Sequence, residues 1–335
     1  MAPVYIREQG AVVRRQGERL VVTRDKERLL DLPLLHVDQV VLFGNVQLTS
    51  QAVAMLLQKE VDVVFLSHYG KFRGRLMHTG SKFAQLRHAQ LQKLSDEAVN
   101  LAVARQVVIG KLHNQRHLLA EQTQREPRNV ELPRAVTALG QLAERATRAT
   151  NADSLRGFEG SAGARYWGAF KTLIPPTLGF NGRQYFPAPD PVNSLLSFGY
   201  GLLRKDVTAA VQLVGFDPYL GFFHTIDYGR PSLALDMMEE FRPPLVDWVV
   251  LKLIADQQVA PADVERTGNP KQPIRLSEPL MARLIERYEQ RVQEKVFHPE
   301  AGGETSRRRV IELQVRRLAQ LILGRSRQYK PFLMQ

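Results

Sequence analysis

Residues 61–94 of the chain read VDVVFLSHYGKFRGRLMHTGSKFAQLRHAQLQKL. The first part holds two short runs, VDVVFL and KFRGRL, on either side of the turn residues Tyr69-Gly70, a pattern that predicts two β-strands. After Gly80 this pattern ends and apolar residues recur at helical spacing. The change predicts two domains, a β-rich domain over residues 1–78 and a helical domain over residues 79–335.

Before this stretch, short β-rich runs alternate with turn residues. The runs are VYI, AVVRR, RLVVT, QVVLF and VQLT, with turns at Gln16-Gly17 and Gly44-Asn45. One helix interrupts them, because Thr49-Ser50 offers a cap before the helically spaced AVAMLLQK. A small sheet with one short helix leaves an apolar face that a second copy of the chain can cover.

After residue 82 the sequence is mostly helical. Residues 82–94 and 95–126 are amphipathic, Asp153 is a candidate cap for a helix through about Leu173, and Pro175-Pro176 ends that helix. Later helices are expected to begin near Val192, Ser232, Leu245, Pro279 and Thr305. The predicted fold class is therefore α+β, with a small N-terminal β-domain followed by a larger, all-helical domain.

The composition limits the possible functions. The 335 residues include 46 Lys or Arg, 34 Asp or Glu and no cysteine, for a formal net charge of +12. Without cysteine, disulfides, thiolate metal sites and cysteine nucleophiles are excluded, so metal ligands must be nitrogen or oxygen. With no secretory signal and no apolar span of ~20 residues, we expect a cytoplasmic protein outside the membrane. The positive charge favours a polyanionic partner such as nucleic acid.

The last 35 residues hold half of this net charge. Eight Lys or Arg against two Glu give +6. On a helix from about Thr305, the apolar residues can face the core while the arginines point outward, either into solvent or toward DNA. Guanidinium groups suit phosphate, so the DNA-binding candidates are Arg307, Arg308, Arg309, Arg316 and Arg317.

The segment HTIDYGRPSLALDMMEEFRPP, residues 224–244, carries the strongest chemical signal. Asp236 and Glu239 are three residues apart and share one helical face, and Glu240 lies close to the same side. A solvated acidic face is one interpretation. The helix is otherwise apolar, however, and charges on a largely buried helix need partners, among which a divalent metal ion is effective.

Two further segments place polar residues in unusual surroundings. In SLRGFEGSAGARYWGAF, glycines crowd the face of Glu159 and would admit a helix or a DNA backbone, while Tyr166 lies two turns further on. In NSLLSFGYGLLRK, Asn193 and Tyr200 are two turns apart, either bonded to each other in the core or supporting a site. Gly-x-Ser-x-Gly, Walker and His-Glu-x-x-His motifs are absent from the sequence.

In order and spacing, these segments resemble the CRISPR-associated integrase family that inserts new spacers, usually called the Cas-one nuclease. The segments that carry the resemblance are VDVVFLSHYGKFRGRL, GFEGSAGARYW, NSLLSFGYGLL, GFDPYLGFFH and SLALDMMEEFRP. The resemblance implies catalytic roles for Glu159, His224, Asp236 and Glu239. Glu159, His224 and Glu239 would be the metal ligands, with Glu240 an alternative for the last position, where the family often has aspartate. The metal ligands would be held in position by Tyr166, Asn193 and Tyr200, which would not bind the ion themselves.

One imidazole among carboxylates can hold Mg²⁺ or Mn²⁺. Such an ion would assist the attack of a 3′-hydroxyl, or of water, on a phosphodiester. The resemblance further implies a homodimer formed through the β-domain, and a small companion acquisition protein that bridges two dimers. The DNA partners would be double-stranded, a prespacer and the CRISPR repeat, in a system of antiviral defence.

Three other functions compete with this one. The first is a sister role, as a transposon-borne integrase or a nuclease that acts on branched DNA. The second is a catalytically silent, architectural DNA-binding subunit, although such a subunit need not keep all four site residues. The third is a helical RNA-processing or regulatory factor, for which the sequence lacks a helix-turn-helix or an RNA-binding aromatic signature.

Overall fold

The computed structural model describes residues 2–68, 72–76 and 83–335. The chain divides into two compact units, Met1–Ser81 and Lys82–Gln335. The first unit is built around β-sheets and the second around helices, which confirms the predicted α+β class. The predicted border at residue 78 and the turn Tyr69-Gly70 lie outside the described residues.

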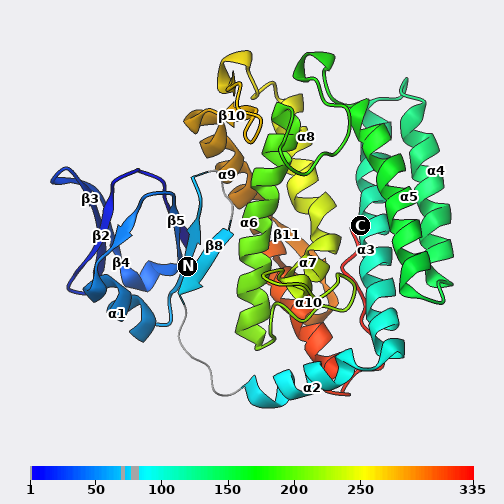
Figure 1. Ribbon diagram of the computed structural model, residues 1–335, viewed down its shortest axis with the longest axis horizontal. Helices are drawn as coiled ribbons and strands as arrows, with labels where there is room; N and C mark the ends of the chain where they lie inside the picture. Colours follow the sequence, from blue (N-terminus) through cyan, green and yellow to red (C-terminus); the bar gives the residue numbers. More distant parts are fainter. Residues whose placement is uncertain (1, 69–71, 77–82) are drawn as a thin grey trace. The chain divides into compact units, whose positions relative to one another are not determined.

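The described part of the first unit forms two four-stranded sheets (Figure 1). In one sheet, parallel strands β1, β5 and β7 are joined by antiparallel β8. In the other, β4, β3 and β2 are antiparallel and β6 lies parallel to β2. The bounds are β1 (Ala2–Ile6), β2 (Val12–Gln16), β3 (Arg19–Arg24), β4 (Glu27–Pro33), β5 (Val37–Phe43), β6 (Gln47–Leu48), β7 (Asp62–Leu66) and β8 (Phe72–Leu76), with a 3-10 turn, η1, at Leu34–His36.

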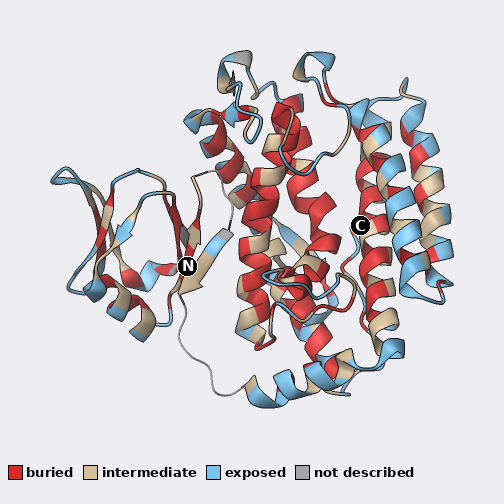
Figure 2. Ribbon diagram, in the orientation of Figure 1, coloured by how far each residue is buried: buried red, intermediate tan, exposed pale blue. Residues whose placement is uncertain are grey.

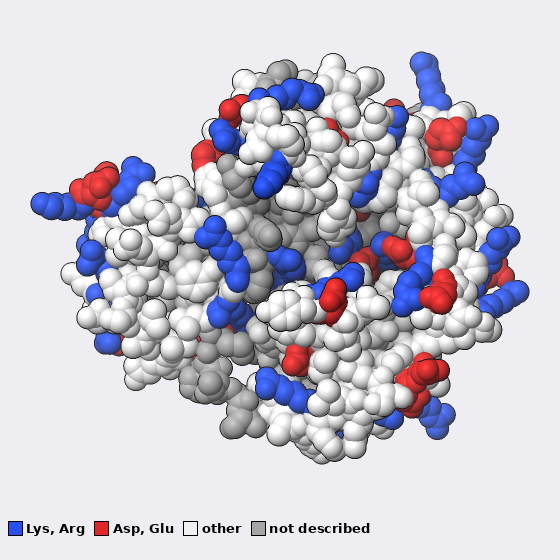
Figure 3. Space-filling model, in the orientation of Figure 1, with Lys and Arg blue, Asp and Glu red and all other residues white. Residues whose placement is uncertain are grey.

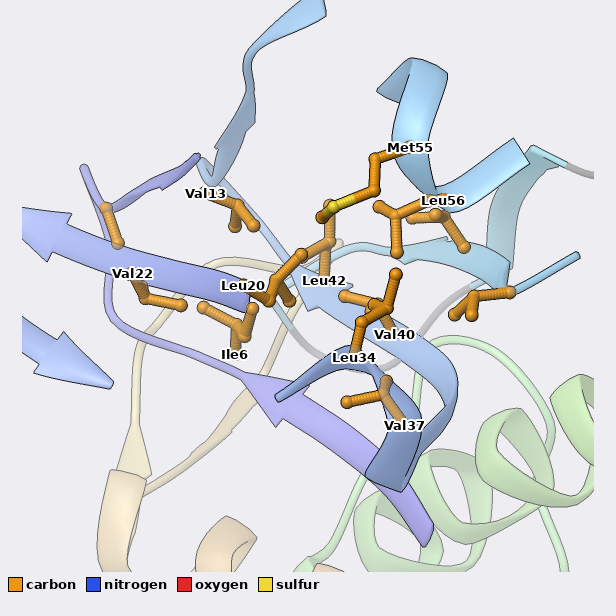
Figure 4. Close-up of a cluster of buried hydrophobic side chains, with 13 residues drawn as sticks. Ile6, Val13, Leu20, Val22, Leu34, Val37, Val40, Leu42, Met55 and Leu56 are labelled. Atoms are coloured by element: carbon orange, nitrogen blue, oxygen red, sulfur yellow. The ribbon is translucent and has the colours of Figure 1, made fainter. Parts of the chain in front are cut away.

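The core of this unit lies where α1 (Ser50–Gln58) covers strand residues (Figure 4). Alternate residues of β5, Val40 and Leu42, contribute to this core beside Met55 of the helix. The oxygen of Thr49 accepts the backbone N–H of Ala52, so the predicted cap is confirmed.

Strand β4 was not predicted. Its turn from β3 is made by Asp25 and Lys26, which both adopt positive φ, 50° and 70°. Because neither residue is glycine, the sequence gives only a weak turn signal there.

The described part of the second unit is mainly helical. Its long helices are α2 (Ala84–Leu94), α3 (Glu97–Arg125), α4 (Glu131–Thr147), α5 (Ala152–Lys171), α6 (Pro191–Val214), α9 (Glu278–Gln293) and α10 (Arg307–Ile322). Asn151 caps α5 by accepting the N–H of Ser154 at 2.8 Å, so the expectation of a cap at Asp153 is wrong. None of the described helices is both long enough and apolar enough to cross a bilayer.

Two short strand pairs correct the expectation of an all-helical domain. They are β9 (Val264–Arg266) with β10 (Ile274–Leu276), and β11 (Lys295–His298) with β12 (Gly303–Ser306). Each strand has only three or four residues, too few to produce a period-two pattern in the sequence. Short 3-10 turns lie beside them and before α6, at η3 (Pro176–Leu178), η6 (Pro261–Asp263) and η7 (Pro299–Ala301).

Helix α6 is the central element of the second unit. It is buried along most of its length, whereas α4 exposes much of its surface (Figure 2). Helices α3, α4 and α5 pack against one another, and α10 packs on α6. A helix that is apolar nearly all round belongs in a core, so α6 is the scaffold on which the other helices are arranged.

An irregular helical rod runs from residue 232 to residue 255. It begins as α7 (Ser232–Met238), tightens into a 3-10 turn, η4 (Glu239–Phe241), widens into a π-helix, η5 (Arg242–Asp247), and ends as α8 (Trp248–Ala255). Pro243 and Pro244 lack the N–H groups that would bond to the carbonyls of residues 239 and 240, so a regular α-helix cannot form there. The helix expected from Leu245 is the second half of this rod.

Candidate active site

The imidazole of His224 is held by one buried carboxylate. Oδ1 of Asp236 lies 2.6 Å from Nδ1 of His224. The two Asp236 oxygens also accept the backbone N–H groups of Phe222, Phe223 and His224 at 2.6, 3.0 and 2.9 Å. A Cβ at Gly221 would lie 2.8 Å from Asp236 Oδ2, so this approach requires glycine. Both oxygens of Asp236 are therefore occupied in holding the ring and its loop in place. Nε2 of His224 remains available to the cavity.

Lys111 of α3 brings two of the predicted ligands together. Its Nζ lies 2.5 Å from Oε1 of Glu159, on α5, and 2.7 Å from Oε2 of Glu239, on η4. The other Glu239 oxygen accepts Nε–H of Arg242 at 3.1 Å and lies 3.8 Å from Nε2 of His224. Glu239 thus lies beside both Glu159 and His224, although Glu159 and His224 are far from it in sequence.

Electrostatics keep this cluster charged. Burial by itself would raise the pKa of Glu239, but Arg242, Lys111 and His224 outweigh it and lower that pKa to about 2. Burial opposes the charge of Lys111, yet Glu239 and Glu159 together raise the pKa of the ammonium. Glu239 is therefore ionised and Lys111 protonated at neutral pH.

The cluster fits a divalent metal ion. Within the described residues, no three His, Asp or Glu side chains stand as a preformed ion site, because the Lys111 ammonium takes the place between the carboxylates. Oε2 of Glu239 is buried and pairs with the Lys111 ammonium at 2.7 Å, so a cation already occupies the position that the carboxylates face. Two carboxylates and one imidazole nitrogen are donors that suit Mg²⁺ or Mn²⁺. Such an ion and the Lys111 ammonium would compete for the place between the two carboxylates.

Tyr166 and Tyr200 converge on a carboxylate that sequence reasoning did not single out. Their hydroxyls donate to Asp247 at 2.8 and 2.5 Å. Burial raises the pKa of Asp247 to about 6, although the two hydrogen bonds act in the opposite direction. The guanidinium of Arg242 lies 4.6 Å from the ring centroid of Tyr200. This network joins α5, α6 and the π-helix behind the ligand cluster.

Asn193 supports the site differently. Its Oδ1 accepts Arg183 Nη1 and the backbone N–H of Gln184, both at 2.9 Å, and its Nδ2 donates to the carbonyl of Gly182 at 2.9 Å. Asn193 and Tyr200 therefore bind different partners, and the interpretation that they bond each other is wrong. Asn193 fixes the loop that carries Arg183 into the cavity.

These groups surround a cavity of about 590 Å³. Carboxylates, one imidazole and several cationic groups face it, so the cavity can hold an anion beside a metal ion. Its lining residues are Lys111, Gln115, Glu159, Gly163, Trp167, Arg183, Tyr185, Tyr200, Arg204, His224, Gly229, Arg230, Pro231, Leu235, Glu239, Arg242 and Asp247.

The glycines of α5 leave open space rather than a helix contact. A Cβ at Gly157, Gly160 or Gly163 would meet no described atom within 4 Å. The surface beside Glu159 is thus free to receive a ligand.

Glu240 does not line the cavity. Its oxygens bind Tyr329 Oη and the backbone N–H of Phe332, both at 2.6 Å. Burial raises its pKa to about 7 despite these hydrogen bonds. As placed, Glu239 faces the other predicted ligands and Glu240 does not.

Residues 4–290 match the family model described as CRISPR associated protein Cas1. The chain belongs to the Cas1 family. A CRISPR-associated endonuclease Cas1 of Thermus thermophilus is 35% identical over 98% of this chain and 96% of its own length. A CRISPR-associated exonuclease Cas4/endonuclease Cas1 fusion of Geobacter sulfurreducens is 34% identical over 98% of this chain, which spans 60% of that fusion.

Solved structures share the fold. A casposase bound to an integration product has a TM-score of 0.85 at 23% identity, over 98% of this chain and 93% of that one. A Cas6-RT-Cas1–Cas2 complex has a TM-score of 0.84 at 25% identity, over all of this chain and 36% of that one. Membership of the Cas1 family confirms the predicted class of function, a CRISPR-associated nuclease.

The expectation that the arginines of this Cas1 chain's last helix point outward is wrong for three of five. Arg307 pairs with Glu294, Arg308 with Glu289 and Asp206, and Arg317 with Glu300, and their side chains are 14–21% exposed. Arg309 and Arg316 are each 48% exposed and share Glu312. On the face that Figure 3 shows, Lys and Arg are spread among acids rather than gathered in one patch. DNA binding by this helix stays a prediction.

Several lining residues escaped sequence reasoning. Asp247 offered a signal, as an acid inside the apolar run that continues through α8. Lys111 and Arg183 offered none, because a cation on a long helix or in a polar loop is ordinary in sequence.

Proposed function

We propose that Glu159, His224 and Glu239 hold one Mg²⁺ or Mn²⁺ ion, and that the protein inserts spacer DNA into a CRISPR array by strand transfer. The observation that carries the proposal is the position of Glu239 between the other two residues: its Oε2 shares Lys111 Nζ with Glu159, and its Oε1 lies 3.8 Å from Nε2 of His224. Asp236 would act through His224, as a positioning residue.

In the reaction, a DNA 3′-hydroxyl loses its proton and its oxygen forms a bond to phosphorus, while another P–O bond breaks and the departing oxygen gains a proton. When bound, the ion supplies Lewis acidity that polarises the phosphodiester and stabilises the departing oxygen. Asp236 accepts a hydrogen bond from Nδ1 of His224, so Nε2 is the ring nitrogen that would meet the ion. Endonuclease activity uses the same groups, with water in place of the 3′-hydroxyl.

Arg183 is suited to orient the substrate. Its guanidinium donates to Asn193 and to Ser197, and it lies 4.7 Å from the Tyr185 ring centroid. These neutral partners fix the group without cancelling its charge, so it can bind a phosphate oxygen at little entropic cost. Lys111 also lines the cavity and would supply a further cation to the substrate.

The DNA partners we propose are a double-stranded prespacer and the CRISPR repeat, supported by the net charge of +12 and by the cationic cavity lining. We also propose a homodimer through the β-unit and a small companion of the Cas2 kind, in the cytoplasm. A Cas1–Cas2 assembly among the similar structures supports the companion. Sedimentation of the full chain tests the dimer, since a strict monomer at micromolar concentration would refute a constitutive one.

The central test measures DNA affinity and Mn²⁺-dependent strand transfer on the same preparations of Glu159→Ala, His224→Ala and Glu239→Ala. Joining should collapse in each, while affinity stays near that of the unchanged protein, because phosphate contacts are spread over the surface. Glu144→Ala, at an exposed acid of α4, is the matched control.

Near-normal joining by a folded variant would remove that residue from the ligand set. A wild-type protein that binds DNA but joins nothing, with or without the companion, would instead indicate an architectural subunit. Efficient joining without any companion would favour the first alternative, a transposon-borne integrase that acts alone.

A further inference from the structure

Glu239 and Glu240 are neighbours in η4, but their side chains serve different parts of the molecule. Glu239 faces the cavity, whereas Glu240 binds an extended segment, residues 329–334, which we call the C-terminal strap. Three residues of the strap, Tyr329, Phe332 and Met334, are buried, at most 8% exposed. The strap thus packs directly behind the turn that carries a proposed ligand.

The Glu240 carboxylate is fully engaged with the strap and α10. Oε1 accepts the hydroxyl of Tyr329, and Oε2 accepts the backbone N–H of Phe332, both at 2.6 Å. Nε2 of Gln314, on α10, lies 3.3 Å from both oxygens and 3.1 Å from Tyr329 Oη. The rings of Phe241 and Phe332 stack at 5.8 Å. Polar and apolar contacts therefore fix the strap to η4.

Asn114 of α3 completes the attachment. Because Pro244 has no N–H, the carbonyl of Glu240 lacks its usual helical partner, and Asn114 Nδ2 donates to it at 2.7 Å. The same amide donates to Phe332 O at 2.9 Å, and its Oδ1 accepts the N–H of Met334 at 2.8 Å. One fully buried side chain thus joins α3, η4 and the strap.

The contact between α3 and the strap is close. A Cβ at Gly110 would lie 2.6 Å from Pro331 Cβ and 3.4 Å from Glu240 Cβ. Gly110 precedes Lys111, the residue that bridges Glu159 and Glu239. The same segment of α3 therefore contacts the strap and η4 and carries Lys111.

We infer that the C-terminal strap is a positioning element that sets where Glu239 stands relative to Glu159 and His224. The inference rests on the proposed function, in which Glu239 is a ligand. At η4 the helical hydrogen-bond pattern changes from α to π, and the carbonyl of Glu240 bonds to Asn114, so tertiary contacts help to decide where this turn lies. Metal sites need their ligands held within about 0.5 Å, which makes ion affinity sensitive to the strap.

The test uses two full-length variants that disturb the strap in different ways. Tyr329→Phe removes one hydrogen bond to Glu240, and Gly110→Ala pushes on Pro331 without changing a polar group. Tyr288→Phe is the matched control, because that buried tyrosine donates to Asp206 at 2.7 Å and does not line the cavity. Measurements are Mn²⁺ affinity by electron paramagnetic resonance, urea unfolding without metal, DNA affinity, and strand transfer against Mn²⁺ concentration.

We expect Mn²⁺ affinity to fall about 10-fold in both strap variants, with the rate at saturating Mn²⁺ recovering toward normal. In Tyr288→Phe, stability should fall while Mn²⁺ affinity stays unchanged. Equal Mn²⁺ affinity in the strap variants and the wild type would overturn the inference, since the strap would then only stabilise the fold.

Glu239→Ala, measured alongside, separates this inference from the proposed function. If Glu239→Ala binds Mn²⁺ as the wild type does, Glu239 is not a ligand and both proposals fail. If Glu239→Ala binds weakly while Tyr329→Phe and Gly110→Ala bind normally, the inference alone fails.

Discussion

Oδ1 of Asp236 and Nδ1 of His224 lie 2.6 Å apart, and this contact decides which ring nitrogen is available. A carboxylate at this distance accepts a proton from Nδ1, which leaves Nε2, 3.8 Å from Oε1 of Glu239, as the ring nitrogen available to the cavity. The same carboxylate accepts three backbone N–H groups of the preceding loop. One side chain therefore orients both the ring and the loop that carries it.

Asp236→Asn should weaken both stability and catalysis. An amide offers one acceptor oxygen where the carboxylate offers two, and its NH₂ would face N–H donors. We expect the free energy of unfolding to fall by about 1–3 kcal/mol and strand transfer to fall roughly 10–100-fold. Urea unfolding and strand-transfer rates check this, with Asp227→Asn in the exposed part of the same loop as control. Unchanged joining would mean that His224 needs no such support.

Lys111→Met should make the protein depend on metal for stability. Without the ammonium, Glu159 and Glu239 lose their shared cation, which should cost about 3 kcal/mol in metal-free buffer. An added ion would replace the missing charge, so Mn²⁺ should raise the Tm more in the variant than in the wild type. Thermal unfolding with and without Mn²⁺ measures both, and Lys252→Met is the surface control. If Mn²⁺ raises the Tm of the variant and of the wild type equally, the ion and the Lys111 ammonium do not share one position.

Asp247→Asn should change how stability varies with pH. The folded pKa of Asp247 is raised from 3.8 to about 6, so between these values the folded state keeps a proton that the unfolded chain releases. Ionisation of Asp247 therefore lowers wild-type stability as pH rises through this window, by at most about 3 kcal/mol. The stability deficit of the variant should shrink from pH 4 to pH 7. Urea unfolding across this range measures the deficit, with Asp153→Asn as control. A stability deficit that stays constant from pH 4 to pH 7 would contradict the prediction.

The arginines of α10 should separate into two classes. Arg308→Ala removes the partner of Glu289 and Asp206, so we expect a stability loss of about 2 kcal/mol with an unchanged salt dependence of DNA binding. The double variant Arg309→Ala/Arg316→Ala should keep its stability but flatten the slope of log affinity against log salt by up to ~2. If the double variant leaves that slope unchanged, α10 faces away from DNA.

Much of the fold could be predicted because its signals are local. Alternating strands before residue 78 and helical spacing after it fix the α+β class, and Thr49 caps α1 as expected. Features that depend on two or three residues gave weaker signals. The turn at Asp25-Lys26 contains no glycine, and the short strand pairs of the second unit contain too few residues for a pattern.

In the candidate site, too, residues in recognisable motifs could be predicted and residues without a local signal could not. Glu159, His224 and Glu239 could be named from ordered motifs, and the structure brings them together. Lys111 and Asp247 belong to the same cavity only because the chain folds back on itself, which no local pattern encodes. The orientation of Arg308 failed for a related reason, since its acidic partners lie on α6 and α9.

The irregular rod of residues 232–255 has a consequence for the entropy of substrate binding. Glu239, Arg242 and Asp247 all line the cavity from this one rod, because its 3-10 and π turns change the spacing of side chains around the axis. Active-site groups carried on loops often have to be ordered when the substrate arrives, and each ordered residue costs roughly 1–2 kcal/mol of conformational entropy. Here the backbone of these three positions is ordered when the protein folds, so at these positions an arriving substrate has only side chains left to arrange.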